Sequence, residues 1–219
     1  MLHITTTSHL HHYTCKPKTK QELYKIIIQR IEEDDLECDL NDIDVSKITD
    51  MSYLFNANHE FMGNTIFTKF NCDISRWDVS NVKNMKWMFS GCVQFNCDLS
   101  DWDVSNVEDM RIMFNGCEKF NCDISRWDVS KVKDMETMFY GCTAFNQDID
   151  NWNVSNVRDM YNAFEHCSTQ PKWYNKWIQT NIITKMHFPL TSNGPAAPIY
   201  IKNINTLNEY FNSLKTSMH

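Results

Sequence analysis

Residues 95–117 read FNCDLSDWDVSNVEDMRIMFNGC, and close variants of this stretch recur along the chain at a fixed spacing. Four sets of equivalent residues each step by 25 positions. The sets are Trp77, Trp102, Trp127 and Trp152; Val79, Val104, Val129 and Val154; Met85, Met110, Met135 and Met160; and Phe89, Phe114, Phe139 and Phe164. A strict period of this length is typical of repeat proteins, in which each unit buries its apolar side against its neighbours.

Each repeat is predicted to contain one short helix and one short strand. Ser105 to Glu108 has the spacing of a helix N-cap with a capping box, and apolar residues follow it at helical intervals. Gly116 can then end the helix with positive φ. The segment 97–101 is expected to pair in parallel with 72–76 and 122–126. These features predict an α/β solenoid, leucine-rich-repeat-like, of about five 25-residue coils, with helical caps at both ends.

The domain boundaries follow from where the repeat starts and stops. Residues 38–46 align with residues 72–80, a separation of 34, so nine extra residues are inserted within 56–69. Before this first coil, a capping-box sequence and an apolar stripe predict a helix over 20–34. The expected segments are a flexible tail (1–16), an N-terminal capping helix (17–37), the repeat solenoid (38–170, insert 56–69), a C-terminal cap (171–188), and a linker with an amphipathic helix (189–219).

Charge and composition exclude several classes of protein. The chain of 219 residues has a formal net charge of −7, and residues 96–120 hold six acidic residues against two basic ones. An acidic repeat region argues against nucleic acid as the partner. No window approaches the ~18–20 apolar residues of a membrane span, and the N-terminus does not read as a secretory signal. We therefore expect an intracellular protein, with a surface or virion-associated location by an unrecognised route as the alternative.

The nine cysteines follow the repeat rather than a disulfide pattern. Equivalent residues in stacked coils lie about 4.8 Å apart, which is slightly long for the ~3.8 Å Cβ separation of a disulfide. We expect buried thiols that act as small apolar groups in a reducing compartment. No Cys or His spacing suits a metal, and we predict neither a metal site nor a cofactor. One column is Cys38, Cys72, Cys97 and Cys122, and another is Cys92, Cys117, Cys142 and Cys167.

Polar columns raise two alternatives for the acidic residues. Aspartates stacked ~5 Å apart repel one another, so each must be offset by backbone N–H groups of its own turn or by Ca²⁺ held between coils. A column of asparagines is expected to bond to the backbone of the neighbouring coil. The aspartate columns are Asp39, Asp73, Asp98, Asp123 and Asp148, and Asp44, Asp78, Asp103 and Asp128; the asparagines are Asn71, Asn96, Asn121 and Asn146.

Two sets of residues are candidates for binding a partner. The first lies one step off the buried stripe and is apolar in the first three coils: Tyr53, Trp87 and Ile112. These side chains are either roofed by the insert 56–69 or exposed as a contact patch. The second set alternates in charge on the strand side: Arg76, Asp101 and Arg126. It forms either a solvated face or a binding surface.

The repeat pattern Phe-Asn-x-Asp-Ile-Ser-x-Trp-Asp-Val-Ser-Asn-Val-x-x-Met-x-x-Met-Phe-x-Gly-Cys resembles the BspA-type leucine-rich-repeat family. The likeness covers residues 17–168 and includes the N-terminal segment that leads into Asp50-Met51-Ser52-Tyr53-Leu54-Phe55. The resemblance implies a leucine-rich-repeat-like fold and a role in binding, such as adhesion or receptor contact. It implies no catalytic residues.

These observations favour a non-enzymatic protein–protein interaction module, a rigid repeat platform that binds another macromolecule. No Ser-His-Asp set, phosphate loop or zinc motif is present in the sequence. One alternative is a structural component that self-associates through its terminal elements. Another is a hydrolase with an unrecognised site.

Overall fold

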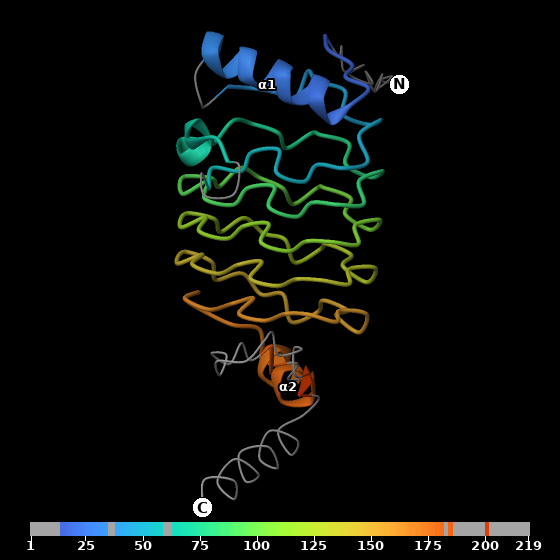
Figure 1. The fold of residues 1–219 in the computed structure, drawn as a ribbon, viewed down its shortest axis with the longest axis vertical. Coiled ribbons are helices and arrows are strands. Elements are labelled where there is room, and N and C mark those ends of the chain that lie inside the picture. The colour runs from blue at the N-terminus through green and yellow to red at the C-terminus, as the bar shows by residue number, and fades with distance from the viewer. Residues whose placement is uncertain (1–13, 35–37, 59–62, 182–183, 186–199, 202–219) are drawn as a thin grey trace, which may run out of the picture.

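The computed structural model describes residues 14–34, 38–58, 63–181, 184–185 and 200–201. Helix α1 (Lys20–Asp34) lies at one end of the molecule and α2 (Lys172–Asn181) at the other, with the repeats layered between them (Figure 1). A short 3-10 helix, η2 (Thr65–Lys69), lies within the insert. Two-residue strands, β1 (Thr184–Lys185) and β2 (Tyr200–Ile201), pair antiparallel after α2.

The α/β solenoid predicted from the sequence is wrong. Between residues 38 and 170, the described residues form no strand, and η2 is their one helix. The leucine-rich-repeat-like coil, with a strand and a helix in each unit, therefore does not describe these repeats. The described helices at the two ends of the chain are α1, at the residues expected for it, and α2, inside the segment 171–188.

Consecutive tight turns take the place of the predicted helix. In the third repeat, Met113 N–H donates to Met110 O at 3.3 Å and Cys117 N–H donates to Phe114 O at 2.9 Å. Within the first of these turns Ile112 has φ 60°, which no α-helix accommodates. A chain of turns also returns every third residue to the same side. The apolar spacing that indicated a helix is therefore equally a product of turns.

Alternate backbone N–H groups are directed to the next repeat instead of along a helix. Met85 N–H donates to Asp109 O and Trp87 N–H donates to Arg111 O, both at 2.9 Å. Phe89 continues the series with Met113 O at 2.9 Å. Equivalent bonds join each successive pair of repeats, and they produce isolated parallel bridges rather than strands. The layers are thus held together by backbone bonds perpendicular to them.

The predicted strand at 97–101 is also replaced by turns. Ser100 N–H donates to the Asp98 carboxylate at 2.9 Å, and Trp102 N–H donates to Leu99 O at 3.1 Å. Leu99 N–H donates to Cys122 Sγ at 3.0 Å rather than to a carbonyl of the neighbouring repeat. Because its donors are used in this way, the segment cannot form a ladder with its equivalents.

Stacked aromatic rings fill the core between the layers. The Phe89 and Phe114 rings lie 5.6 Å apart with an interplanar angle of 1°, and both side chains are fully buried. The buried tryptophans each donate an indole N–H to a carbonyl of the preceding repeat, as Trp102 does to Ile74 O at 3.1 Å. Burial of rings against rings supplies the main stabilisation, and the indole bonds fix the register.

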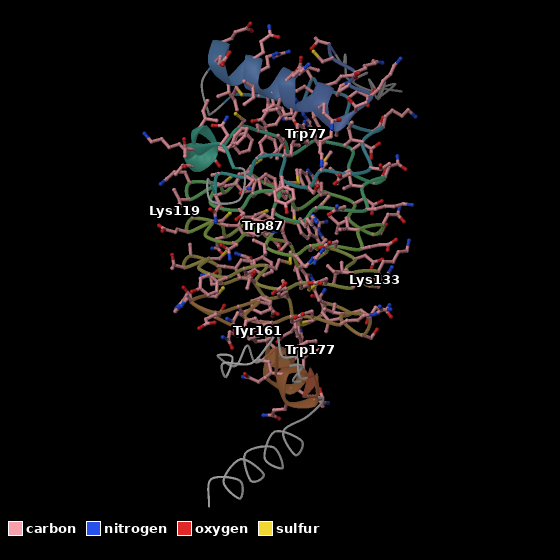
Figure 2. The ribbon with its side chains drawn as sticks, viewed as in Figure 1. Trp77, Trp87, Lys119, Lys133, Tyr161 and Trp177 are labelled. Atoms are coloured by element: carbon pink, nitrogen blue, oxygen red, sulfur yellow. The ribbon has the colours of Figure 1, made fainter. Side chains whose placement is uncertain are left out.

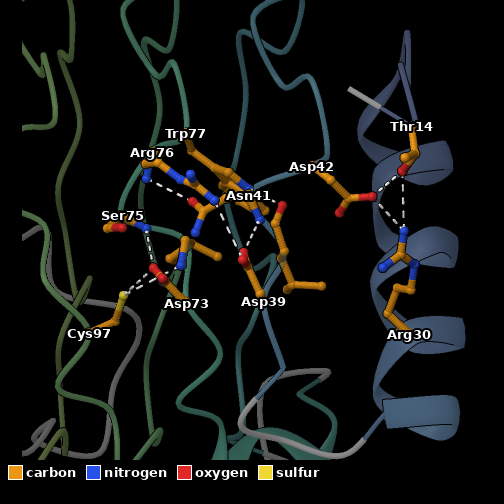
Figure 3. A network of polar contacts seen from close by, with 12 residues as sticks. Thr14, Arg30, Asp39, Asn41, Asp42, Asp73, Ser75, Arg76, Trp77 and Cys97 are labelled. Carbon is orange, nitrogen blue, oxygen red and sulfur yellow. Dashed lines mark hydrogen bonds and ion pairs between the residues drawn. The ribbon is translucent and has the colours of Figure 1, made fainter. Parts of the chain in front are cut away.

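The terminal helices close the two ends of the stack with polar and apolar contacts. Lys20 of α1 forms an ion pair with Asp50 at 2.8 Å, and Arg30 of α1 forms one with Asp42 at 2.7 Å. Figure 3 shows Arg30 and Thr14 in contact with the Asp42 carboxylate. At the other end, Trp173 donates its indole N–H to Ile149 O at 3.1 Å. This is the bond that a tryptophan of a further repeat would make.

Several expectations fall on residues outside those described: the tail before residue 14, and nearly all of the linker and amphipathic helix expected over 189–219. Among the described helices, none has the length and apolar character needed to cross a membrane.

Candidate functional site

One column of side chains on the stack combines a strained backbone with a partly exposed surface. Its residues have φ of 62°, 60°, 60°, 47° and 51°, and all five are half-buried. We call it the left-handed column: Tyr53, Trp87, Ile112, Thr137 and Asn162. It contains the three apolar residues that the sequence marked as candidates for binding.

The turns of the repeat force this conformation. Before each of these residues, an Asp or Asn side chain accepts a backbone N–H two positions on; Asn84 accepts from Lys86 at 3.1 Å. The left-handed residue then donates its own N–H to the next repeat, as Trp87 does. An L-residue pays roughly 1–2 kcal/mol for this region, and a β-branched one such as Ile112 fits it worst.

A second left-handed column shows the usual solution to the same problem. Gly91, Gly116 and Gly141 have φ of 79°, 72° and 73°, as the sequence predicted for the glycines that end each turn segment. Glycine adopts this region at no steric cost. This column has glycine at three positions and His166, with φ 63°, at the next, whereas the column that starts at Tyr53 has no glycine and carries large apolar side chains at its first three positions.

The first two side chains of the left-handed column form an aromatic pair. The rings of Tyr53 and Trp87 are stacked, with centroids 5.8 Å apart and an interplanar angle of 11°. The Lys86 ammonium lies 5.7 Å from the centroid of the Tyr53 ring, within cation–π range. Figure 2 labels Trp87 midway along the stack. The pair presents a partly exposed aromatic surface next to a positive charge.

The insert is the proposed roof of this pair, and its described part packs elsewhere. Phe67 is buried and contacts Tyr24 of α1 and the core rings Phe55 and Phe70, at 5.6–6.1 Å between centroids. Residues 59–62, which include Phe61, lie outside the described residues. Phe67 therefore anchors the insert to the core and to α1 rather than over Tyr53.

The residues that directly precede the left-handed column include the charged Arg111, before Ile112, and the exposed aromatic residue Tyr161, before Asn162. Arg111 pairs with Asp109 at 2.7 Å and with Asp134 at 3.6 Å, and its hydrogen bond to Asp109 raises the pKa of the guanidinium. Burial raises the pKa of Asp134 to about 6, which the Arg111 charge only partly offsets. Tyr161 is 51% exposed, the most exposed large apolar side chain among the described residues. Figure 2 places it near the C-terminal end of the stack.

The second candidate set lies on a different part of each repeat. Arg76 pairs with Asp39 at 3.4 Å, and Arg126 pairs with Asp101 at 3.3 Å, with more than half of each side chain exposed. Such pairs contribute little stability. The two sets belong to segments that face each other across the core, where Phe55 and Trp77 are 5.9 Å apart. The structure therefore does not bring Arg76, Asp101 and Arg126 together with Tyr53, Trp87 and Ile112.

The aspartate columns are explained by turn geometry, as one of the two sequence alternatives predicted. Asp98 and Asp123 each accept the backbone N–H two residues on, at 2.9 Å, and bonds with Ser100 and Ser125 lower the pKa of these carboxyls. Every member of both columns makes such a bond. Within the described residues, no cluster of three His, Cys, Asp or Glu side chains could hold a metal ion.

The predicted asparagine ladder is present. The side chains of Asn71 and Asn96 accept the backbone N–H groups of Asn96 and Asn121 in the next repeat, at 2.9 and 2.8 Å. Sequence reasoning missed a parallel role for the buried cysteines. Cys92 and Cys117 donate their thiols to carbonyls of the preceding repeat at 3.0 Å. The strict 25-residue spacing of these cysteines could have indicated that their thiols form hydrogen bonds between repeats in addition to filling the apolar core.

A hollow of about 460 Å³ on the described surface is open and polar. Its lining includes Lys131, Lys133, Arg158 and Glu108. Lys133 pairs with Glu108, and Lys131 donates to Asn106 at 2.7 Å, so two of the three cations are already engaged. The hollow shows no nucleophile held by a general base.

Comparison with known proteins identifies one family. The family model described as "Mycoplasma protein of unknown function, DUF285" matches residues 27–72 and 62–177, more than half of the chain. No curated protein and no solved structure matches the chain.

Proposed function

The chain belongs to the family described as Mycoplasma protein of unknown function, DUF285, and from the site we propose that it is a non-enzymatic protein-binding module. Its binding face is the left-handed column with the aromatic pair at its centre. The partner would be another protein that places an apolar or aromatic group on Trp87 and an acidic group beside Lys86.

The left-handed column is the observation that carries this proposal. Glycine there would relieve a strained backbone, and the chain uses glycine at its other left-handed column. Tyr53, Trp87 and Ile112 recover only part of the strain by burial, because each remains partly exposed. Strain retained at a surface is more often found at functional positions than elsewhere. Aromatic residues with partial burial are also the residues that dominate protein interfaces.

The repeats give this surface the rigidity that a binding platform needs. Each layer is fixed by four backbone bonds to the next layer along the turn segment and by stacked buried rings. Side chains held on such a scaffold lose little conformational entropy when a partner binds. The likeness of the repeat to BspA-type proteins, whose role is binding, supports the same class of function.

Glycine substitution offers a test that spares the fold. Tyr53→Gly and Trp87→Gly remove the aromatic pair and relax the backbone at the same positions, whereas Thr137→Gly relaxes the same column without removing an aromatic ring. Affinity capture from the source organism, followed by mass spectrometry, should recover a protein with the native chain and with Thr137→Gly. Recovery should fall at least tenfold with either aromatic variant.

The same experiment covers the self-association alternative. Capture of a second copy of the chain, lost in Tyr53→Gly and Trp87→Gly, would make the partner this protein itself. Equal recovery with all four proteins, or the same proteins as an unrelated control, would contradict the proposal. We propose an intracellular location, with a surface or virion-associated location by an unrecognised route as the alternative.

A further inference from the structure

Two cysteines from the first and second repeats lie in direct contact. The sulfur atoms of Cys38 and Cys72 are 2.7 Å apart, and both side chains are buried, with 8% and 0% exposed. Their backbones are tied together on the same side. Asp73 N–H donates to Cys38 O at 2.8 Å, and Leu40 N–H donates to Asp73 O at 2.9 Å. The contact is therefore held by the fold and not by the side chains alone.

The other members of this cysteine column are arranged differently. Ile74 N–H and Leu99 N–H donate to the thiols of Cys97 and Cys122, at 3.4 and 3.0 Å. These two thiols also lie 3.8 and 3.6 Å from aspartate carboxylates of the preceding repeat, and Figure 3 shows Cys97 directed at Asp73. Each of these two thiols therefore accepts a backbone N–H and lies beside a carboxylate.

In the first pair of repeats the N–H equivalent to those of Ile74 and Leu99 has a different acceptor. There the equivalent N–H, on Leu40, donates to the Asp73 carbonyl, and Asp39 and Asp73 form a parallel bridge that no later pair of repeats has. Cys72 therefore receives no N–H from Leu40, and its sulfur approaches that of Cys38. The distinction arises from the first repeat's own backbone and is not a property of the repeated sequence.

We propose that Cys38 and Cys72 form a disulfide that joins the first two repeats. The sulfur atoms would have to close from 2.7 Å to the ~2.05 Å of an S–S bond. The link would span the insert, because residues 56–69 lie between the two cysteines. It would fix the repeat that carries Tyr53 to the repeat that carries Trp87.

The oxidant is a small-molecule disulfide of the glutathione class. One cysteine thiolate attacks the oxidant and releases one small thiolate, which leaves a mixed disulfide on the protein. The second cysteine thiolate then attacks the protein sulfur of that mixed disulfide and releases the second small thiolate. The S–S bond of the oxidant is replaced by the protein S–S bond, and the two cysteine protons end on the two small thiols.

Burial determines when this exchange can occur. The reactive form is the thiolate, and desolvation raises the pKa of the Cys72 thiol, with a further contribution from Cys38. The folded, reduced protein should therefore exchange slowly, and a disulfide formed during folding should resist reduction. Folding in the presence of the oxidant is the condition under which the link should form.

The test uses the full chain, denatured and reduced, then refolded with either oxidised glutathione or a reducing agent. Thiols are counted after denaturation, and linked peptides are mapped by mass spectrometry. We expect nine thiols in the reduced sample and seven in the oxidised sample, with a Cys38–Cys72 peptide. Cys122→Ser should still lose two thiols, because Cys122 belongs to the same column but its sulfur accepts the N–H of Leu99. Cys72→Ser and Cys38→Ser should lose none.

A second readout keeps the test valid if either serine variant fails to fold. Oxidised native protein should unfold at a Tm higher by roughly 5–10 °C than reduced protein, because the link closes a loop of more than 30 residues in the unfolded chain. The proposal is overturned if nine thiols remain after oxidative refolding, if the mapped link joins other cysteines, or if Cys72→Ser is oxidised as fully as the native chain.

Discussion

Replacing Asp134 with Asn should stabilise the protein at neutral pH and stabilise it much less in mild acid. Asp134 accepts Glu136 N–H at 3.0 Å, and Asn84 makes the same bond with Lys86 two repeats earlier at 3.1 Å. The chain itself thus shows that an amide fits this position. What the amide removes is a partly buried negative charge.

The size of the effect follows from the pKa. Burial raises the pKa of Asp134 to about 6 from an ordinary value of 3.8, and the charges of Asp159 and Asp109 add to the rise. At 1.36 kcal/mol per unit, the charged form costs up to about 3 kcal/mol of folding free energy at pH 7. The nearby Arg111 is bonded to Asp109 and lies 3.6 Å from Asp134. Removing the attraction between Arg111 and residue 134 therefore offsets little of the gain in stability.

The sign of the pH dependence follows from proton linkage. The native carboxyl binds its proton more tightly than the unfolded one, so this group adds stability as pH falls from about 7 to about 4. Asp134→Asn should therefore raise the free energy of unfolding by about 1–3 kcal/mol at pH 7.5 and by roughly a third of that amount at pH 4.5, because the unfolded carboxyl is still mostly ionised there. Urea denaturation followed by tryptophan fluorescence measures both values.

A matched variant separates this effect from a general loss of acid groups. The pKa of Asp98 is lowered by its bond with Ser100, so the contribution of Asp98 is present at neutral pH and is lost as pH falls below about 4. Asp98→Asn should therefore destabilise at pH 7.5. If Asp134→Asn gave no gain at pH 7.5, or the same change at both pH values, the argument from burial would be refuted.

Two further substitutions test the turn geometry and the C-terminal cap. Ile112→Gly should be more stable than Ile112→Ala by roughly 1 kcal/mol, because φ is 60° at this position. At neighbouring Glu136, the usual preference for Ala over Gly should hold. Thermal melts of the Gly and Ala variants at both positions measure the difference. Trp173→Phe removes the indole bond to Ile149 O and should cost about 1 kcal/mol; hydrogen exchange should show faster opening confined to the last repeat, and uniform acceleration along the stack would contradict a capping role.

Much of the arrangement could be predicted because identical residues at one spacing must occupy equivalent places. The helix over residues 20–34, the positive φ of the glycines, the aspartate turns and the asparagine ladder are all confirmed. Each depends on contacts within one repeat or between equivalent residues of adjacent repeats. Such contacts can be deduced from a period without knowledge of the path between them.

The secondary structure of the repeat could not be predicted in the same way. Met110, Met113 and Phe114 share one side in a helix and also in a chain of turns, so their spacing does not separate the two. The difference lies in where alternate N–H groups donate, and that depends on a neighbouring layer. For the candidate site, the sequence marked Tyr53 and Trp87 as one column, whereas their stacked rings and left-handed backbone emerged only with the structure.

The amino-acid sequence by itself determined the period, the buried columns and the turn-forming residues, because these are properties of residue type and spacing. The tertiary structure decided which backbone donors join one layer to the next, which large side chains carry positive φ, and which cysteines meet. Those outcomes depend on competition between neighbouring layers for the same hydrogen bonds. The contact of Cys38 with Cys72, set by a single carbonyl that accepts the N–H of Leu40, is the plainest case.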